Sequence, residues 1–147
     1  MTLDFENPLG HGTDGSVWKS SKKTAVKVFK LEANFTTELE CYKRLFDNKI
    51  VKLDGFAVPQ LIRFHNSLLV IEMAIVSPPF ILDFAKCHLD HPREFEEGGK
   101  EEWMAYSEEL FEHNWRKVRS VLYSLQQIGI YYYDAKPGNI VFKDTGL

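Results

Sequence analysis

The sequence predicts an α+β fold in which an antiparallel β-sheet comes first and a mainly helical part follows. The first observation is that residues 24–30 alternate between two faces, as a half-buried strand does. The second is that residues 35–46 and 115–128 carry apolar side chains at the three- and four-residue spacing of amphipathic helices. The third is that 44% of the 147 residues are hydrophobic, which is enough to bury a core.

The N-terminal part is expected to form consecutive antiparallel strands. Glycines within residues 10–15 predict the turn of a hairpin, and residues 16–19 would leave that turn before a second one at residues 20–23. In the strand that follows, Ala25, Lys27 and Phe29 share one face. Because burying an unpaired ammonium group is costly, Lys27 needs a partner on this apolar face.

The candidate partner of Lys27 lies on the helix predicted over residues 35–46, for which Asn34 could be the N-terminal cap. Glu38 borders the apolar stripe of this helix, whereas Glu40 lies on the side of the basic residues. Helical phase therefore favours Glu38 over Glu40 as the carboxylate that faces Lys27.

The residues after this helix predict two further strands and then a break. One strand is expected from residues 55–58 and 60–64 together, and the next over residues 67–73. The Ser-Pro-Pro run at residues 77–79 interrupts the pattern, so we place a domain boundary just before it. The two domains would then be residues 1–74 and 75–147.

The second domain is expected to be mainly helical. We predict a short helix over residues 80–87, a charged loop over residues 88–99 and a helix over residues 101–112. The last helix, residues 115–128, carries a broad apolar stripe and is ended by Gly129.

Composition narrows the classes of function and the compartment. A formal net charge of -3 argues against a surface that coats nucleic acid. The two cysteines have no framework spacing and suit a reducing cytoplasm in which both stay free. The N-terminus lacks a signal-peptide pattern, and no apolar run reaches the roughly 18 residues of a membrane-spanning helix. We therefore expect a cytoplasmic protein that binds neither nucleic acid nor membrane.

Three motifs are informative because of their order and spacing. Residues 9–17, Leu-Gly-His-Gly-Thr-Asp-Gly-Ser-Val, fit the pattern G-x-G-x-x-G-x-V, and residues 25–27, Ala-Val-Lys, follow on the next strand. Residues 132–139, Tyr-Tyr-Asp-Ala-Lys-Pro-Gly-Asn, place an acid, a cation and an amide between a helix and a short apolar run. Each motif alone has an ordinary alternative, namely a hairpin turn, a snorkelling lysine or a set of turn formers. Together they are much harder to obtain by chance.

With these motifs the chain resembles the eukaryotic-type protein kinases, over their small lobe and the opening of their large lobe. The resemblance implies a sheet lobe with one main helix, followed by a short, mainly helical part of the second lobe. It also implies that backbone amides at Gly10, Gly12 and Gly15 cover the nucleotide phosphates, where a Cβ would hold the backbone away. Val17 and Ala25 belong to the same implied nucleotide-binding set.

The resemblance assigns further roles around the nucleotide. Lys27 resembles the strand lysine that binds the α- and β-phosphates, and Glu38 resembles the helix glutamate that holds this lysine. Ile71 would lie at the back of the adenine pocket, and the backbone of Glu72 and Ala74 would bond the adenine edge.

In the C-terminal motif the resemblance implies the chemistry itself. Asp134 resembles the aspartate that orients the accepting hydroxyl, and Lys136 would neutralise charge on the transferred phosphoryl group. Asn139 would hold a Mg²⁺ ion. The implied cofactors are therefore ATP and Mg²⁺, and the implied acceptor is a protein.

The chain departs from the family pattern in three places. Tyr132 and Tyr133 stand where the family has His-Arg, so the usual coupling to a phosphorylated activation loop is missing. Asp14 places a negative charge at the tip of the glycine loop. The metal-binding Asp-Phe-Gly is expected about a dozen residues after Asn139, beyond residue 147. Residues 144–146, Asp-Thr-Gly, are disfavoured as a substitute because they read better as a hairpin turn.

The leading expectation is an ATP-binding, protein kinase-like protein that transfers phosphoryl groups from Mg-ATP to a protein hydroxyl. Lys136 favours serine or threonine over tyrosine as the acceptor. One alternative is a catalytically inactive kinase-like module that binds nucleotide or a partner, which the missing metal aspartate supports. A small-molecule kinase would share the same nucleotide site and also stays open.

The apolar stripe on residues 115–128 carries a separate expectation about partners. In the family this stripe is covered by helices that follow the part of the fold found here. We therefore expect the stripe to be exposed and to serve self-association or partner binding, unless a continuation of the same chain covers it.

Overall fold

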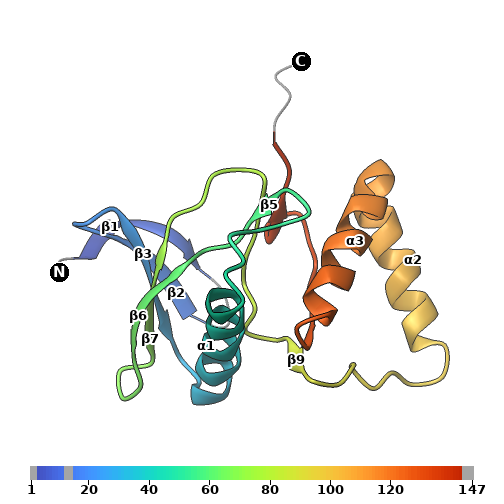
Figure 1. Cartoon of the computed structure of the whole chain (residues 1–147), viewed down its shortest axis with the longest axis horizontal. Coiled ribbons are helices and arrows are strands. Elements are labelled where there is room, and N and C mark those ends of the chain that lie inside the picture. Colours follow the sequence, from blue (N-terminus) through green and yellow to red (C-terminus); the bar gives the residue numbers. More distant parts are fainter. Residues whose placement is uncertain (1–2, 12–14, 144–147) are drawn as a thin grey trace.

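The computed structural model describes residues 3–11 and 15–143 and confirms the α+β class. Figure 1 shows a β-sheet with helix α1 at one end of the molecule and the helices α2 and α3 at the other, with short strands between them. None of the helices in the described part of the chain is long and apolar enough to cross a membrane.

The larger sheet has five strands in the order β1-β2-β3-β7-β6, and all neighbours in it are antiparallel. The alternation in residues 24–30 places Lys27 opposite Val17 on one neighbouring strand and opposite Ile71 on the other. Lys27 is thus in a central strand. The strands are β1 (Leu3–His11), β2 (Gly15–Ser20), β3 (Thr24–Phe29), β6 (Leu61–His65) and β7 (Val70–Ala74).

Helix α1 (Glu32–Asp47) packs against this sheet through its apolar stripe. Phe35 on the helix meets Phe29 on β3 edge-to-face, with ring centroids 5.7 Å apart. The helix begins before residue 35, so the expected cap at Asn34 is wrong. The capping position is Leu31, which makes no side-chain cap bond, and the acidic Glu32 in the first turn favours the helix N-terminus electrostatically.

A second sheet of four strands has the order β11-β8-β5-β4. Here the prediction of one strand from residues 55–58 and 60–64 is wrong, because these residues contribute to two different sheets. Pro59, which has no N–H to donate, lies between the two parts. The predicted strand over residues 67–73 begins only at Val70, because Leu69 has a φ of 53° in the preceding turn. The new strands are β4 (Lys52–Leu53), β5 (Phe56–Ala57), β8 (Phe80–Ile81) and β11 (Ile140–Val141).

The short helix predicted over residues 80–87 is also wrong. Strand β8 pairs with β11, Ile81 lying opposite Ile140, and tertiary pairing here overrides the local pattern. Asp83 then has a φ of 71°, which a helix does not tolerate. Strand β9 (His88–Leu89) pairs with β10 (Ile130–Tyr131) at the start and near the end of the helical part.

The two predicted C-terminal helices are confirmed, with ends shifted by one or two residues. They are α2 (Gly99–Phe111) and α3 (Trp115–Gln126), joined by the short 3₁₀ helix η1 (Glu112–Asn114). The stripe on α3 is buried, however, and not exposed as expected. Helix α2 and strands β4 and β10 of the same chain contact α3 and cover the stripe. The buried stripe residues are Trp115, Val118, Val121, Leu122 and Leu125.

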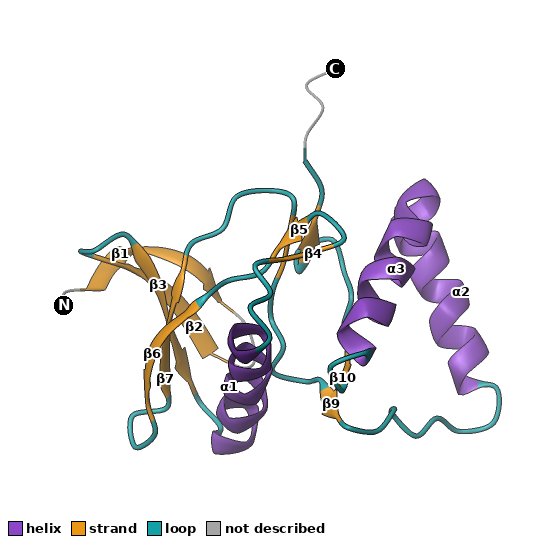
Figure 2. Ribbon diagram, viewed as in Figure 1, coloured by secondary structure: helices purple, strands orange, loops and turns teal. Residues whose placement is uncertain are grey.

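The second sheet draws its strands from both sides of the predicted domain boundary. Strands β4 and β5 precede residue 74, whereas β8 and β11 follow it, and Figure 2 shows β4 and β5 between the large sheet and the helices. Two segments far apart in the chain, β8 and β11, are therefore held side by side next to the large sheet.

Candidate functional site

A cavity of about 520 Å³ lies where the large sheet, α1 and the ends of β8 and β11 come together. Its walls are mostly apolar, with side chains from β2, β3 and β7 on one side and Phe80 and Leu82 on the other. A few polar groups converge in it, as in many ligand sites. They come from Lys27, Glu38, Tyr42, Asp83 and Asn139.

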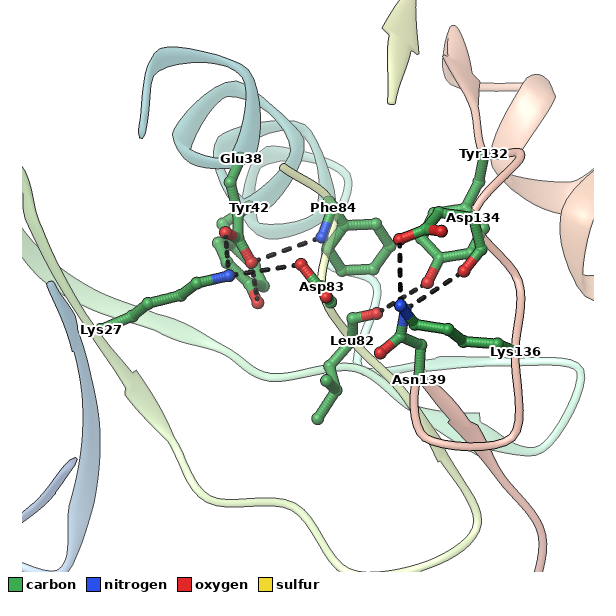
Figure 3. A network of polar contacts seen from close by, with 10 residues as sticks. All are labelled: Lys27, Glu38, Tyr42, Leu82, Asp83, Phe84, Tyr132, Asp134, Lys136 and Asn139. Carbon is green, nitrogen blue, oxygen red and sulfur yellow. Dashed lines mark hydrogen bonds and ion pairs between the residues drawn. The ribbon is translucent and has the colours of Figure 1, made fainter. Parts of the chain in front are cut away.

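Lys27 and Glu38 form a buried ion pair at this cavity (Figure 3). The Lys27 Nζ lies 2.8 Å from the Glu38 Oε2, and the two residues are only 7% and 1% exposed. Glu40 instead pairs with Arg44 within the helix. The choice of Glu38 from helical phase is confirmed, because Glu38 lies on the face of α1 that packs against the sheet.

A second carboxylate, that of Asp83, also contacts Lys27. The Lys27 Nζ lies 3.3 Å from the Asp83 Oδ1, and the Asp83 side chain keeps 25% of its surface exposed. Asp83 follows β8 in the left-handed backbone region, with a φ of 71°. This conformation, uncommon for a residue other than glycine, is the kind of local strain that gathers at functional sites.

Burial and charge act in opposite directions on this pair. Burial disfavours the charged form of Lys27, but the carboxylates of Glu38 and Asp83 outweigh burial and raise the pKa of Lys27. Burial is the main influence on Glu38 and raises the pKa of its carboxyl, with Lys27 acting against that rise. Glu38 nevertheless accepts three hydrogen bonds, from Lys27, the Tyr42 hydroxyl and the Phe84 backbone, which favour its ionised form.

An aromatic stack holds the backbone on both sides of Asp83. The Phe84 ring lies edge-to-face between Tyr42 and Tyr132, with centroid distances of 5.5 Å and 5.7 Å. The Phe84 N–H donates to the Glu38 Oε1 at 3.3 Å. On the other side, the Tyr132 hydroxyl donates to the Leu82 carbonyl at 3.0 Å. Asp83 is therefore fixed between two anchored neighbours.

The C-terminal motif forms a turn next to Asp83. The Asn139 Nδ2 donates to the Asp134 carbonyl at 3.1 Å, and the Lys136 Nζ lies 3.8 Å from the Asp134 Oδ2. The Leu82 N–H donates to the Asn139 carbonyl at 3.0 Å, which brings Asn139 beside the residue that precedes Asp83. Asn139 is 6% exposed, whereas the side chains of Asp134 and Lys136 are 38% and 55% exposed.

The structure brings together most of the residues that the sequence assigned to the nucleotide site. Ile71 and Glu72 do not line the cavity. Ile71 is completely buried, and the Glu72 carboxylate accepts hydrogen bonds from Thr24 and Arg63. Asp134 and Lys136 are likewise outside the lining. The predicted residues that line the cavity are Gly15, Val17, Ala25, Lys27, Glu38, Ala74 and Asn139.

Two of the three glycines that were predicted to cover the nucleotide phosphates lie in the described residues. Gly10 lies in β1 opposite Val17, and Gly15 lies at the start of β2. Gly15 has a structural role of its own, because a Cβ at this position would lie 2.1 Å from the Val28 carbonyl oxygen. Gly12 and Asp14 fall outside the described residues, as do residues 144–146.

Asp83 is the site residue that sequence reasoning missed. The signal was present in residues 83–85, Asp-Phe-Ala, which differ at one position from the Asp-Phe-Gly that was expected after Asn139. The triplet was overlooked because it lies before the C-terminal motif, in a segment predicted to be helical. Apolar lining residues were also missed, among them Met73, Phe80 and Leu82.

Asp83 and Asn139 supply oxygen groups of the kind that Mg²⁺ prefers, one carboxylate and one amide, to the same cavity. The Asn139 Nδ2 is turned to a carbonyl, so the amide Oδ1 points away from that bond, and the Asp83 carboxylate lines the same cavity. Mg²⁺ is usually held by one or two protein groups plus water and substrate phosphates. Among the described residues there is no cluster of three or more His, Cys, Asp or Glu side chains that could hold a metal ion by themselves.

No family model matches this chain, and no curated protein matches it. The interpretation of the cavity therefore rests on its geometry and on the motifs in the sequence.

Proposed function

We propose that the chain binds ATP with Mg²⁺ in this cavity and transfers the γ-phosphoryl group to a protein hydroxyl, with serine or threonine favoured. The observation that carries the proposal is the buried Lys27, which is held by Glu38 and Asp83 in a cavity that Asn139 also lines. A lysine held by two carboxylates is positioned to meet a polyanionic ligand. The motifs that resemble protein kinases support the same ligand.

Different residues of the chain would bind the base and the phosphates of the nucleotide. The apolar side chains of Val17, Ala25 and Leu82 offer the flat surfaces that a purine base requires. The ammonium group of Lys27 would contact the phosphates. Glu38 holds that ammonium group in place and leaves it charged.

Asp83 and Asn139 are the groups that would hold Mg²⁺. When bound, Mg²⁺ neutralises charge on the β- and γ-phosphate oxygens. The anchored backbone around Asp83 keeps its carboxylate at the cavity before any ligand arrives. Such preorganisation lowers the cost of ordering the site.

Asp134 and Lys136 would act on the acceptor side. The partly exposed Asp134 carboxylate can accept a hydrogen bond from an incoming hydroxyl and orient it. The Lys136 ammonium group, 3.8 Å from that carboxylate, would balance negative charge on the transferred group.

One observation favours a second candidate, a module that binds nucleotide without transferring phosphate. Lys27, Asp83 and Asn139, the groups proposed to contact the phosphates and Mg²⁺, line the cavity, whereas Asp134 and Lys136 do not. Binding and transfer thus depend on different residues and can be tested apart.

The test is a calorimetric ATP titration combined with an assay of phosphoryl transfer to a generic protein substrate. Lys27→Ala should abolish binding, and the matched control Lys19→Ala, which removes an exposed lysine from the neighbouring strand, should not. Asp134→Asn should keep ATP affinity and lose transfer. Transfer that survives in Asp134→Asn would overturn its role, and folded wild type that binds no ATP would overturn the proposed function. ATP binding without any transfer would establish the second candidate.

A further inference from the structure

Arg44 joins the helix that carries Glu38 to the segment that leads to Asp134. Its Nη1 and Nη2 donate to the two carboxylate oxygens of Asp90, each at 2.9 Å. This two-pronged arrangement is the strongest geometry for an arginine–carboxylate pair. The Nη1 also donates to the backbone carbonyls of Ile128 and Gly129, at 3.1 Å and 3.2 Å.

The partners of Arg44 lie where β9 and β10 meet. Asp90 directly follows β9 and Gly129 directly precedes β10, and the Asp90 N–H donates to the Gly129 carbonyl at 2.8 Å. The chain runs from β10 through Tyr132 to Asp134. We call Arg44, Asp90 and the two carbonyls the Arg44 latch.

Gly129 leaves the space that the Arg44 latch needs. Its φ is +77°, and a Cβ at this position would lie 2.5 Å from the Asp90 Oδ1 and 2.6 Å from the Arg44 Nη1. Gly129 therefore does more than end α3. Any side chain here would displace the Asp90 carboxylate or the guanidinium group.

The Arg44 latch lies outside the cavity, since none of its members is among the lining residues. Arg44 is six residues after Glu38 on α1, roughly 9 Å along the helix axis. The Arg44 side chain is 20% exposed, so it is largely covered, whereas the Asp90 side chain is 69% exposed. The two partly buried carbonyl contacts distinguish the latch from an ordinary surface ion pair, which contributes little.

We infer that Arg44 is a positioning residue, which fixes the spacing between the Lys27–Glu38 wall of the cavity and the segment of residues 134–139, of which Asn139 lines the cavity and Asp134 lies beside it. This inference rests on the proposed function. Lys27 and Glu38 belong to the large sheet and α1, whereas Asp134 follows β10. Transfer from a nucleotide held by the first two residues to a hydroxyl oriented by Asp134 therefore requires a defined distance between the two parts. The latch is a direct charged link between these two parts.

The test compares Asp90→Asn and Arg44→Lys with the matched control Glu40→Gln. Asp90→Asn removes the negative charge that faces Arg44 at the end of β9. Glu40→Gln removes the charge that faces Arg44 from its own helix, 3.1 Å from the Nε. Asp90→Asn alters an exposed carboxylate, and Arg44→Lys keeps the positive charge. Each variant should therefore fold, which circular dichroism can verify.

The readouts are the Kd for Mg-ATP, the kcat for phosphoryl transfer, and amide hydrogen exchange. Both latch variants should keep Kd within about threefold and lower kcat on the order of 10-fold, because misplacing a reacting group by 1 Å can cost up to 100-fold. Exchange should rise together in residues 38–45 and 128–134. Glu40→Gln should match wild type in all three.

The outcomes separate the latch from the proposed function. Wild type that binds no Mg-ATP would overturn the proposed function and with it the positioning role. Wild type that binds and transfers, with latch variants that do so equally well, would overturn the positioning role alone. A latch variant that loses kcat without the joint rise in exchange would also contradict it.

Discussion

The two walls of the cavity are held in place by different means. On the sheet wall, Lys27 and Glu38 are almost completely buried and lie on neighbouring elements, β3 and α1. On the other wall, Asp83 depends on contacts with residues from distant parts of the chain, and beside it Asp134 is partly exposed and Lys136 exposed. The comparison teaches that local periodicity is sufficient to predict the ion pair of the first wall, whereas the second wall can be recognised only from contacts between distant parts of the chain.

The largest effect should come from breaking the sheet wall at Glu38. Glu38→Ala leaves Lys27 buried with Asp83 as its remaining partner, and removing one member of a buried ion pair costs about 3–5 kcal/mol. Glu40→Ala is the control, because the Glu40 side chain is 44% exposed and its ion pair with Arg44 lies within the same helix. Urea unfolding followed by circular dichroism measures both. A loss below about 1 kcal/mol for Glu38→Ala would show that the pair does not hold this wall.

The next effect concerns the other wall, through the hydroxyl of Tyr132. Tyr132→Phe keeps the ring against Phe84 but removes the hydrogen bond to the Leu82 carbonyl, which should cost about 1 kcal/mol of unfolding free energy. Because this carbonyl precedes Asp83, the variant should also bind Mg-ATP more weakly. Tyr123→Phe, at an exposed position on α3, is the control. Unchanged Mg-ATP affinity in Tyr132→Phe would contradict the anchoring of Asp83.

A pH titration tests a second buried carboxylate of the large sheet, that of Glu72, which lies outside the cavity and can be compared with Glu38. Burial pushes the pKa of Glu72 up, but hydrogen bonds from Thr24 and Arg63 outweigh burial and lower it below the ordinary value of 4.5. The ionised Glu72 therefore stabilises the fold above that pH, and this stability is lost as the pH falls through the folded-state pKa. Thermal unfolding of Glu72→Gln should be less acid-sensitive than that of wild type below about pH 4.5. Parallel acid profiles for the two proteins would refute this contribution.

The smallest effect is expected where α3 meets the second sheet. The Ser120 and Ser124 hydroxyls both donate to the Asp54 Oδ2, at 3.0 Å and 2.9 Å, on the surface. Asp54→Asn, which tolerates the left-handed backbone at this position (φ 49°) and removes the charge that the hydroxyls face, should cost only about 0.5 kcal/mol, because exposed hydrogen bonds exchange readily with water. ATP affinity should not change. A clear loss of affinity would mean that this contact also positions the second wall.

The same contrast explains what the sequence could predict. The alternation of β3 and the helical phase of α1 together identify Lys27 and Glu38, and both are properties of residues close in the chain. Asp83 was missed because β8 has two residues and becomes a strand only by pairing with β5 and β11. The stripe on α3 was predicted correctly as a pattern, but its burial depends on α2, β4 and β10 and could not be read from the helix itself.

At Glu72 and Tyr132 the sequence pattern also did not reveal the contacts that the side chains make with distant parts of the chain. Glu72 was expected to contribute through its backbone, and its side chain turns to Thr24 and Arg63, a cross-strand network that periodicity alone does not reveal. The departure at Tyr132 has a physical account in the structure, since the tyrosine fills the stack with Phe84 and its hydroxyl holds the Leu82 carbonyl.

In the proposed function, Asp83 and Asn139 complete a Mg-ATP site with Lys27. The most direct measurement is ATP titration of wild type and Asp83→Asn, each with Mg²⁺ and with EDTA. Wild type should bind ATP much more tightly with Mg²⁺, and Asp83→Asn should lose most of that difference while its affinity in EDTA stays the same or rises. Asp83→Asn that retains the full Mg²⁺ dependence would contradict the account.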